Sequence, residues 1–394
     1  MRKVVSQGGR YAFAEAAYNL KELAGVTISA QHVLRLTERV GQEWAQRRER
    51  EMADFEQGRL ARSYAQAPAA AAVMLDGGRA QTRAEPSPPG VKNPEWHESK
   101  FACLLTLKNQ AQSRDPQPEP PAKFTNPAEV PRLVQQIQSL RAPAKGREES
   151  PKGPGRGRRQ RGGRPKRLNL RLVRTVLATM AGVHEFGQQV AVEVYKRGLD
   201  LAAWKACVAD GQASNWTVYE EHLKPLGFIA ILDFLHLLTY LYAAAQAVGG
   251  TEGERWRRYV QWMTWAWQGQ REKVLVALNA ACTKKGAPAK DTPETDPLRV
   301  LSKARTYVTN NADKMDYPRY RKLGLPISSA PVESVIKQFN KRVKGTEKFW
   351  RPSALEAVLQ VRAAQLSEDG REDRLWAALR PSHAPHPNKV PAAA

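Results

Sequence analysis

Cysteine is scarce in this chain of 394 residues. Its three cysteines, Cys103, Cys207 and Cys282, lie far apart and form no CxxC or Cys/His spacing. This excludes the usual structural zinc sites and indicates buried thiols in a reducing cytoplasm. No apolar core follows Met1, so we expect no secretion signal. No GxxxxGK[ST] motif occurs, which excludes a phosphate-loop ATPase.

Long hydrophobic runs are also few, and one segment, 228–248, is about as long as the ~20 residues of a membrane span. It contains Asp233 and His236, and a charged side chain in the bilayer is costly. We therefore expect a buried strand that runs into a helix, and no membrane association.

Acidic residues are outnumbered, with 39 Asp and Glu against 62 Lys and Arg, and the formal net charge is +23. Such a surplus favours nucleic acid as the partner and a cytoplasmic, nucleoid-associated location. Residues 145–167 hold ten Lys or Arg and two Glu among glycines and prolines, which predicts a disordered segment. It is either a phosphate-binding arm or a tolerated basic linker. Its candidate DNA-binding residues are Arg156, Arg158, Arg159 and Arg161.

Residues 1–65 are predicted to be helical, with helices at 13–23 and 30–47 separated by a short turn that contains glycine. Arg35 and Arg39 are four residues apart and share one face of the second helix. This pattern fits a DNA-binding helix-turn-helix, and it fits a plain helical support domain equally well.

The middle of the chain alternates apolar strand patterns with amphipathic helices, which predicts an α/β layer over residues 66–236. The expected strands are 70–75, 101–107, 171–178, 204–209 and 227–232. We expect a disordered Pro-rich and basic insertion at 108–167, an all-α insertion at 237–325 whose tryptophans pack between helices, C-terminal helices at 326–370 and a disordered tail at 371–394.

Three acidic residues carry the chemical prediction. Asp76 and Asp210 each end an apolar run before glycine, and Glu333 follows Pro331 at the start of an amphipathic run. Each has a structural interpretation, because Asp-Gly is a common turn and Glu is favoured in the first turn of a helix. Together, at two strand ends and a helix start in a basic protein, they predict a carboxylate site for Mg²⁺ or Mn²⁺ acting on phosphodiesters.

The order of motifs resembles the DDE transposases of bacterial insertion sequences, in the group akin to eukaryotic Mutator-like elements. The resemblance runs from about Arg10 to Asp369. Its strongest stretches are Asp76-Gly-Gly-Arg-Ala-Gln-Thr-Arg83 with Trp96-His-Glu-Ser-Lys100, Val208-Ala-Asp210-Gly through Ile231-Leu-Asp233-Phe-Leu-His236, and Met315-Asp-Tyr-Pro-Arg-Tyr-Arg321 through Gly324-Leu-Pro-Ile-Ser-Ser-Ala-Pro-Val-Glu333. The family usually has glycines where Ser328 and Ala330 stand, which could weaken activity, and an upstream segment could be missing.

The resemblance implies an RNase H-like mixed sheet with flanking helices, interrupted by the all-α insertion and preceded by the helical N-terminal domain. In this arrangement Asp76, Asp210 and Glu333 would hold two divalent ions about 4 Å apart. Asp233 and His236 match an Asp-x-x-His element that would order the site or the DNA strand, although a satisfied core histidine is an equal alternative. The basic C-terminal helix adds the DNA-binding candidates Lys337, Lys341, Arg342 and Lys344.

The implied function is a transposase that cuts and joins DNA at the ends of an insertion sequence. Its expected partners are transposon-end and target DNA, bound by a homodimer or a larger oligomer, without a small-molecule cofactor. The alternatives are an RNase H-like nuclease without strand transfer and a domesticated or inactive DNA-binding derivative.

Overall fold

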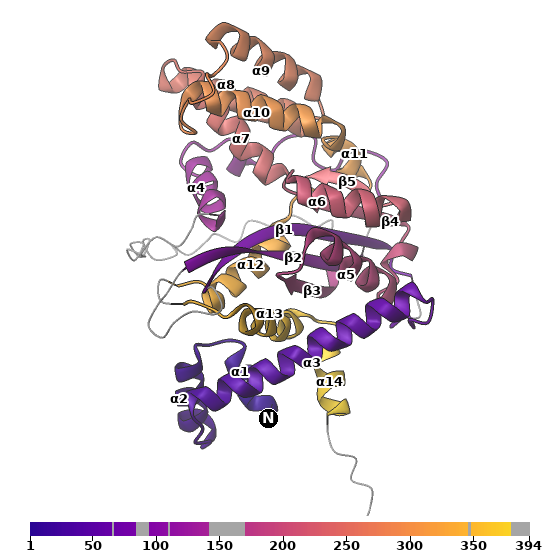
Figure 1. Ribbon diagram of the computed structural model, residues 1–394. Coiled ribbons are helices and arrows are strands. Elements are labelled where there is room, and N and C mark those ends of the chain that lie inside the picture. Colours follow the sequence, from indigo (N-terminus) through magenta and orange to yellow (C-terminus); the bar gives the residue numbers. More distant parts are fainter. Residues whose placement is uncertain (65–66, 84–93, 109–110, 142–169, 346–347, 380–394) are drawn as a thin grey trace, which may run out of the picture.

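The computed structural model describes residues 1–64, 67–83, 94–108, 111–141, 170–345 and 348–379 (Figure 1). The basic segment 145–167, with Arg156, Arg158, Arg159 and Arg161, lies outside the described residues.

A five-stranded mixed sheet forms the centre of the described chain, with the strand order β3-β2-β1-β4-β5. The strands are β1 (Ala70–Arg83), β2 (Pro94–Lys108), β3 (Leu170–Thr179), β4 (Trp204–Ala209) and β5 (Ile229–Leu232). β2 is antiparallel to both β1 and β3, whereas β4 is parallel to β1 and β5 is parallel to β4. The predicted α/β class is therefore confirmed at the level of a mixed sheet with many helices.

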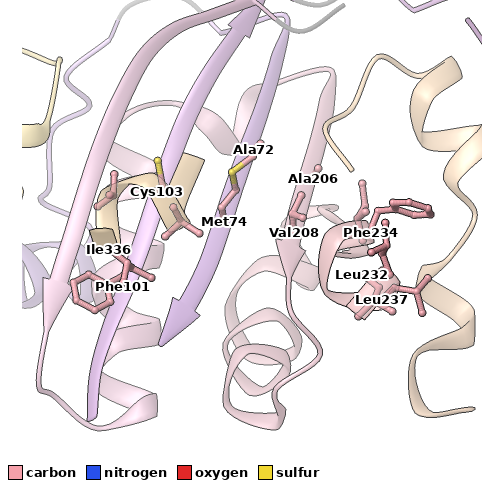
Figure 2. Packing of buried hydrophobic residues seen from close by; sticks show 14 of the residues in the cluster. Ala72, Met74, Phe101, Cys103, Ala206, Val208, Leu232, Phe234, Leu237 and Ile336 are labelled. Carbon is pink, nitrogen blue, oxygen red and sulfur yellow. The ribbon is translucent and has the colours of Figure 1, made fainter. Parts of the chain in front are cut away.

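Both faces of the sheet are covered by helices. Successive side chains of each strand point to opposite faces, so each strand contributes residues to two hydrophobic cores. On one face Val73 and Leu75 pack with the apolar side of α5 (Val183–Lys196) and the short helix α6 (Ala213–Val218). On the other face Met74 and Val208 join a larger core, which also includes α12 (Ala330–Val343) (Figure 2).

The all-α insertion lies beyond the β5 edge of the sheet (Figure 1). Its helices are α7 (Phe234–Ala247), α8 (Glu252–Trp267), α9 (Arg271–Lys285), α10 (Pro297–Asn311) and α11 (Tyr317–Lys322). Trp262 and Trp267 are buried between these helices, as their helical spacing predicts. The two ends of the insertion meet, since the Phe234 N–H donates to the Ile327 carbonyl at 2.9 Å.

The apolar segment 228–248 contributes β5 and α7, so the predicted strand followed by a helix is confirmed. Among the described residues, no helix is both long and apolar enough to cross a membrane.

The Pro-rich stretch before α4 (Val130–Arg141) is irregular, as its prolines predict, but its described part is held against the insertion. The Asp115 carboxylate accepts two hydrogen bonds from Arg321, at 2.9 and 2.5 Å. The Trp267 indole N–H donates to the Gln117 carbonyl at 2.9 Å. We expected disorder throughout 108–167, and these contacts, together with the helix α4, correct that expectation for residues 115–141.

The N-terminal helices are α1 (Arg2–Gly8), α2 (Phe13–Ala24) and α3 (Ala30–Glu56). Gly25 ends α2 with a left-handed φ of 61°, and the Ser29 hydroxyl accepts from the His32 N–H at the start of α3. α3 continues beyond the predicted residue 47 and lies along α13 (Pro352–Leu366) (Figure 1). Their backbones approach so closely that a Cβ on Gly41 would collide with Ala357.

The last helix of the described residues, α14 (Arg371–Ala378), was not predicted from the sequence. The disordered tail expected from residue 371 is therefore wrong for its first eight residues. α14 is held by buried ion pairs: Arg371 Nη2 lies 2.8 Å from Glu193 Oε2 and 2.7 Å from Asp369 Oδ2. We call Glu193, Asp369 and Arg371 the Arg371 cluster. Opposite charges outweigh burial, so the pKa of the Glu193 carboxyl and that of the Asp369 carboxyl are both lowered.

Candidate active site

Three aspartates lie side by side across three parallel strands, one within β1 and the others directly after the last residues of β4 and β5. Leu75, Ala209 and Leu232 are register partners on β1, β4 and β5, and Asp76, Asp210 and Asp233 each come next in the chain. Neighbouring strands are about 4.8 Å apart, so the backbones of adjacent aspartates are separated by about that distance. We call these three residues the carboxylate row.

The carboxylate row faces α12. Each aspartate follows by two residues a member of the register row Met74, Val208 and Ile231, whose side chains lie in the core that includes α12. Side chains two apart on a strand share a face, so Asp76 on β1 points to the side of the sheet on which α12 packs, and Asp233 contacts the start of α12 through Ser329. All three are buried: Asp76 is 7% exposed, Asp210 3% and Asp233 0%.

Backbone and amide donors orient the first two carboxylates. Asp76 Oδ1 accepts from the Gly77 N–H at 2.7 Å. Asp210 Oδ1 accepts from the Gln212 N–H at 3.0 Å and from Asn215 Nδ2 at 2.9 Å. The tight turn after Asp210 requires the positive φ of Gly211, 86°, which a glycine adopts without strain.

Asp233 has a different environment, because several donors converge on its carboxylate. Oδ1 accepts from the Leu235 N–H at 2.7 Å and so caps α7. Oδ2 accepts from the Ser329 N–H at 3.0 Å, from the Ser329 hydroxyl, and lies 3.1 Å from His236 Nδ1. Burial opposes ionisation, but His236 and Ser329 outweigh it and lower the pKa of the Asp233 carboxyl. Asp233 therefore joins the start of α7 to the start of α12.

Glu333 reaches this group from the first turn of α12. Its Oε1 lies 3.9 Å from His236 Nδ1, and its side chain is 7% exposed. In the described part of the chain, Asp233, His236 and Glu333 offer ligand atoms that all lie within 4.8 Å of one another. Asp76 lies on β1 and Asp210 directly follows β4, but the predicted ligands Asp76, Asp210 and Glu333 do not form such a group among the described residues.

The insertion also contacts the row. The Tyr307 hydroxyl of α10 donates to the Asp210 carbonyl at 2.8 Å, and the Tyr307 ring stacks on Tyr240 with centroids 3.8 Å apart. Tyr240 also lines a cavity of about 240 Å³, together with His236, Thr239, Lys303 and other residues. The insertion thus supplies one wall of the region that surrounds the carboxylates.

The predicted DNA-binding residues differ in accessibility. Arg35 and Arg39 are exposed on one face of α3, Lys341 is exposed on α12, and Lys337 and Lys344 are half-buried. The prediction that Arg342 binds DNA is wrong, because its side chain is only 2% exposed and its guanidinium lies over the rings of Phe13 and Trp350. It donates to the Gly8 carbonyl at 3.0 Å, and burial lowers its pKa to about 10. Arg342 therefore joins the N-terminal helices to the core and does not face solvent.

Sequence reasoning missed Ser329, Asn215 and Tyr307. Asn215 lies five residues after Asp210, a spacing that could have indicated a contact across the turn into α6. Ser329 and Tyr307 carry no local signal, because each meets its aspartate from a distant part of the chain.

The donor set suits a hard divalent cation. Buried carboxylate oxygens are the ligands that Mg²⁺ and Mn²⁺ prefer, and an imidazole is compatible with Mn²⁺ or other transition metals. Four carboxylates lie at the same end of the parallel strands. Their negative charges repel one another when all are ionised, and a bound cation would remove this repulsion. The ligand atoms that the structure brings together are those of Asp233, His236 and Glu333, and the assignment of Asp76, Asp210 and Glu333 as direct ligands stays a prediction. No protein-family model and no curated protein matches the chain.

Proposed function

We propose that the chain is a DDE-type DNA transposase that cuts at the ends of an insertion sequence and transfers the ends to target DNA, with Asp76, Asp210 and Glu333 as metal ligands. The observation that carries the proposal is the placement of the three carboxylates. Asp76 lies on β1, Asp210 follows β4, and Glu333 starts the helix after the all-α insertion. This is the order that the motif resemblance implies for an RNase H-like core, and the sheet order β3-β2-β1-β4-β5 is compatible with it.

Some of these residues would hold the metal ions, and others would position those ligands. Mg²⁺ or Mn²⁺, when bound, would activate the attacking hydroxyl and stabilise the leaving oxygen. Asp76, Asp210 and Glu333 would hold the ions, and the Gly77, Gln212 and Asn215 donors would fix the first two carboxylates. Asp233 and Ser329 would hold the first turn of α12 in place, and His236 would remain oriented by Asp233.

The charge of the chain supports DNA as the substrate. A net charge of +23 attracts a polyanion, and the exposed arginines of α3 lie on a separate helical unit that could contact DNA away from the site of cleavage. A homodimer or larger oligomer in the DNA complex would pair the two ends of the element.

The test uses a labelled duplex that carries the inverted repeats flanking this reading frame, together with a supercoiled target plasmid. With Mg²⁺ we expect strand cleavage at the repeat boundary and joined products, and with EDTA neither. Asp76→Asn should retain DNA binding and lose cleavage, because it keeps the shape of the side chain and removes the anionic ligand.

The outcomes separate the alternatives. Cleavage without joined products would favour an RNase H-like nuclease. Binding by the wild-type chain without cleavage in Mg²⁺ or Mn²⁺ would favour an inactive DNA-binding derivative. Undiminished cleavage by Asp76→Asn would contradict the assignment of the carboxylates.

A further inference from the structure

A stripe of lysines runs along α12 away from Glu333. Lys337 follows Glu333 by four residues, about one helical turn, so its side chain leaves the helix on nearly the same side, and Lys344 directly follows the last helical residue, Val343. Lys341 is exposed next to them. At a rise of about 1.5 Å per residue, Lys344 lies about 16 Å from Glu333 along the helix axis.

The segment that follows the stripe lines a groove between the N-terminal helices and the core. The groove has a volume of about 400 Å³. Phe13 of α2 and Gln31, Leu34 and Glu38 of α3 are among its lining residues. The cations Arg83, Lys348 and Arg351 also line it and outnumber the one carboxylate, that of Glu38. Gln31 lies one turn before Arg35 on α3, so the groove borders the helix face that carries Arg35 and Arg39.

The end of β1 fixes the position of this groove. The Arg83 N–H donates to the Trp350 carbonyl at 3.0 Å, and the Trp350 N–H donates to the Gln81 carbonyl at 3.1 Å. Arg83 is seven residues beyond Asp76 on the same strand, which corresponds to about 23 Å. Two elements, α12 and β1, therefore connect the candidate site to the groove.

Cations crowd one another where the stripe meets the groove. The pKa of Lys344 is lowered by burial and by the positive charge of Arg79, and the pKa of Lys348 is lowered by burial and by Arg342, with a small opposing contribution from Glu15. Glu98 is the cross-strand neighbour of Arg79, but its carboxylate already contacts Lys100 and Gln212. Like charges held together in this way destabilise the free protein and favour the binding of a polyanion.

We infer that Lys337, Lys341, Lys344, Arg79 and the groove form a track for the DNA backbone, which connects the candidate active site to α2 and α3. The inference rests on the proposed function and adds to it an expected distance between the DNA contacts and the cleaved bond. At about 3.3 Å per residue, Arg79 lies about 10 Å from Asp76 along β1. The distances of about 10 Å to Arg79 and about 16 Å to Lys344 correspond to about three to five nucleotides at 3.4 Å each along one strand, and the distance of about 23 Å to Arg83 corresponds to about seven. Phosphate contacts of Arg79 and Lys344 should therefore lie about three to five nucleotides from the cleaved bond, and base-specific contacts by α3 should begin beyond the groove.

Ethylation interference on the element-end duplex, performed without divalent metal, tests the track. For the wild-type chain, ethylation of phosphates about three to five nucleotides from the repeat boundary should inhibit binding. In the double variant Arg79→Gln/Lys344→Gln this interference should disappear. The slope of log affinity against log salt should become shallower by about 1.8, at about 0.9 for each phosphate that the variant no longer neutralises.

A matched control removes two charges elsewhere, by Lys284→Gln/Lys285→Gln in the exposed last turn of α9. The control should leave the interference pattern and the salt slope unchanged. Thermal unfolding should show that Arg79→Gln/Lys344→Gln is folded, since the substitution removes a repulsion. An interference pattern and a slope equal to those of the wild type in this folded variant would overturn the inference.

Because the measurement is binding without metal, it does not depend on cleavage. A chain that shows the expected interference but does not cut DNA in Mg²⁺ would contradict the proposed activity and leave the track standing. A chain that cuts at the repeat boundary while the double variant binds like the wild type would contradict the track alone.

Discussion

The sheet carries two buried polar clusters that differ in composition. In the Arg371 cluster one guanidinium lies between two carboxylates, Glu193 and Asp369, and joins α14 to α5. The candidate site brings Asp233 and Glu333 together around one imidazole, that of His236, with Asp76 on β1 and Asp210 directly after β4. The first arrangement is suited to holding protein segments together, and the second is suited to a cation supplied from solution. Burial alone therefore does not distinguish the two clusters, whereas the balance of charged groups around their carboxylates does.

The strongest test of this comparison is Asp210→Asn. The amide keeps an oxygen for the donors on Gln212 and Asn215 but lacks the negative charge of a metal ligand. Changes in groups that merely support metal ligands cost about 10–100-fold in activity, so this direct ligand should cost more than about 100-fold in Mg²⁺-dependent cleavage. Thermal unfolding without metal should be unchanged. A loss of stability with retained cleavage would place Asp210 with the structural cluster.

Glu193→Gln should behave in the opposite way. It leaves the buried Arg371 with one carboxylate fewer, and breaking a buried ion pair costs about 3–5 kcal/mol of unfolding free energy. Denaturant unfolding measures the loss, and cleavage per folded molecule should equal that of the wild type. The exposed pair Lys224 and Glu220 is the matched control, since Glu220→Gln should change stability by less than about 1 kcal/mol.

Ser329→Ala tests the link between Asp233 and α12. The substitution removes the hydroxyl donor to Asp233 Oδ2 and retains the backbone N–H at 3.0 Å. If this contact positions Glu333, cleavage should fall about 10-fold, within the range for groups that support metal ligands, and more Mg²⁺ should be needed for half-maximal rate. Ser329→Thr keeps a hydroxyl and should restore much of the activity. A lower stability with an unchanged Mg²⁺ requirement would indicate a purely structural contact.

The smallest expected effect is a dependence of stability on pH. The pKa values of Glu193 and Asp369 are lowered in the folded chain, so the unfolded chain binds protons first as the pH falls. Their contribution to stability is thus complete above the unfolded pKa values, near pH 4, and is lost as the pH falls toward the folded values. Asp233 adds to the same trend. Unfolding measured between pH 7 and pH 3 should show the decline, and Glu193→Gln should make it less steep.

The elements that could be predicted were those with a strong local pattern. β4 has the predicted bounds, Trp204–Ala209, because it is an apolar run closed by Asp210 and Gly211. β1 and β2 are longer than predicted, since the residues after Asp76 include two glycines and polar side chains that read as a turn. Their hydrogen bonds to each other, which no local pattern records, extend the hairpin to Arg83.

The site was predictable in part for the same reason. Strand ends and a helix start marked Asp76, Asp210 and Glu333, but their partners come from distant segments. Ser329 meets Asp233 across 96 positions of the chain, and Arg342 meets Gly8 across 334. Arg342 reads as one more cation of a basic helix, and its burial results from the aromatic rings that tertiary packing places around it.

The hydrogen bond between Phe234 and Ile327 has a consequence for the modular nature of this chain. Because the two ends of the all-α insertion meet beside the sheet, its length can change without a change in the distance between Asp233 and Glu333. Adding residues to a loop costs little once its ends are fixed, about 0.6 kcal/mol for each doubling of length. The insertion can therefore vary in length outside the contact of Tyr307 with Asp210, and the distance between Asp233 and Glu333 sets no limit on its size.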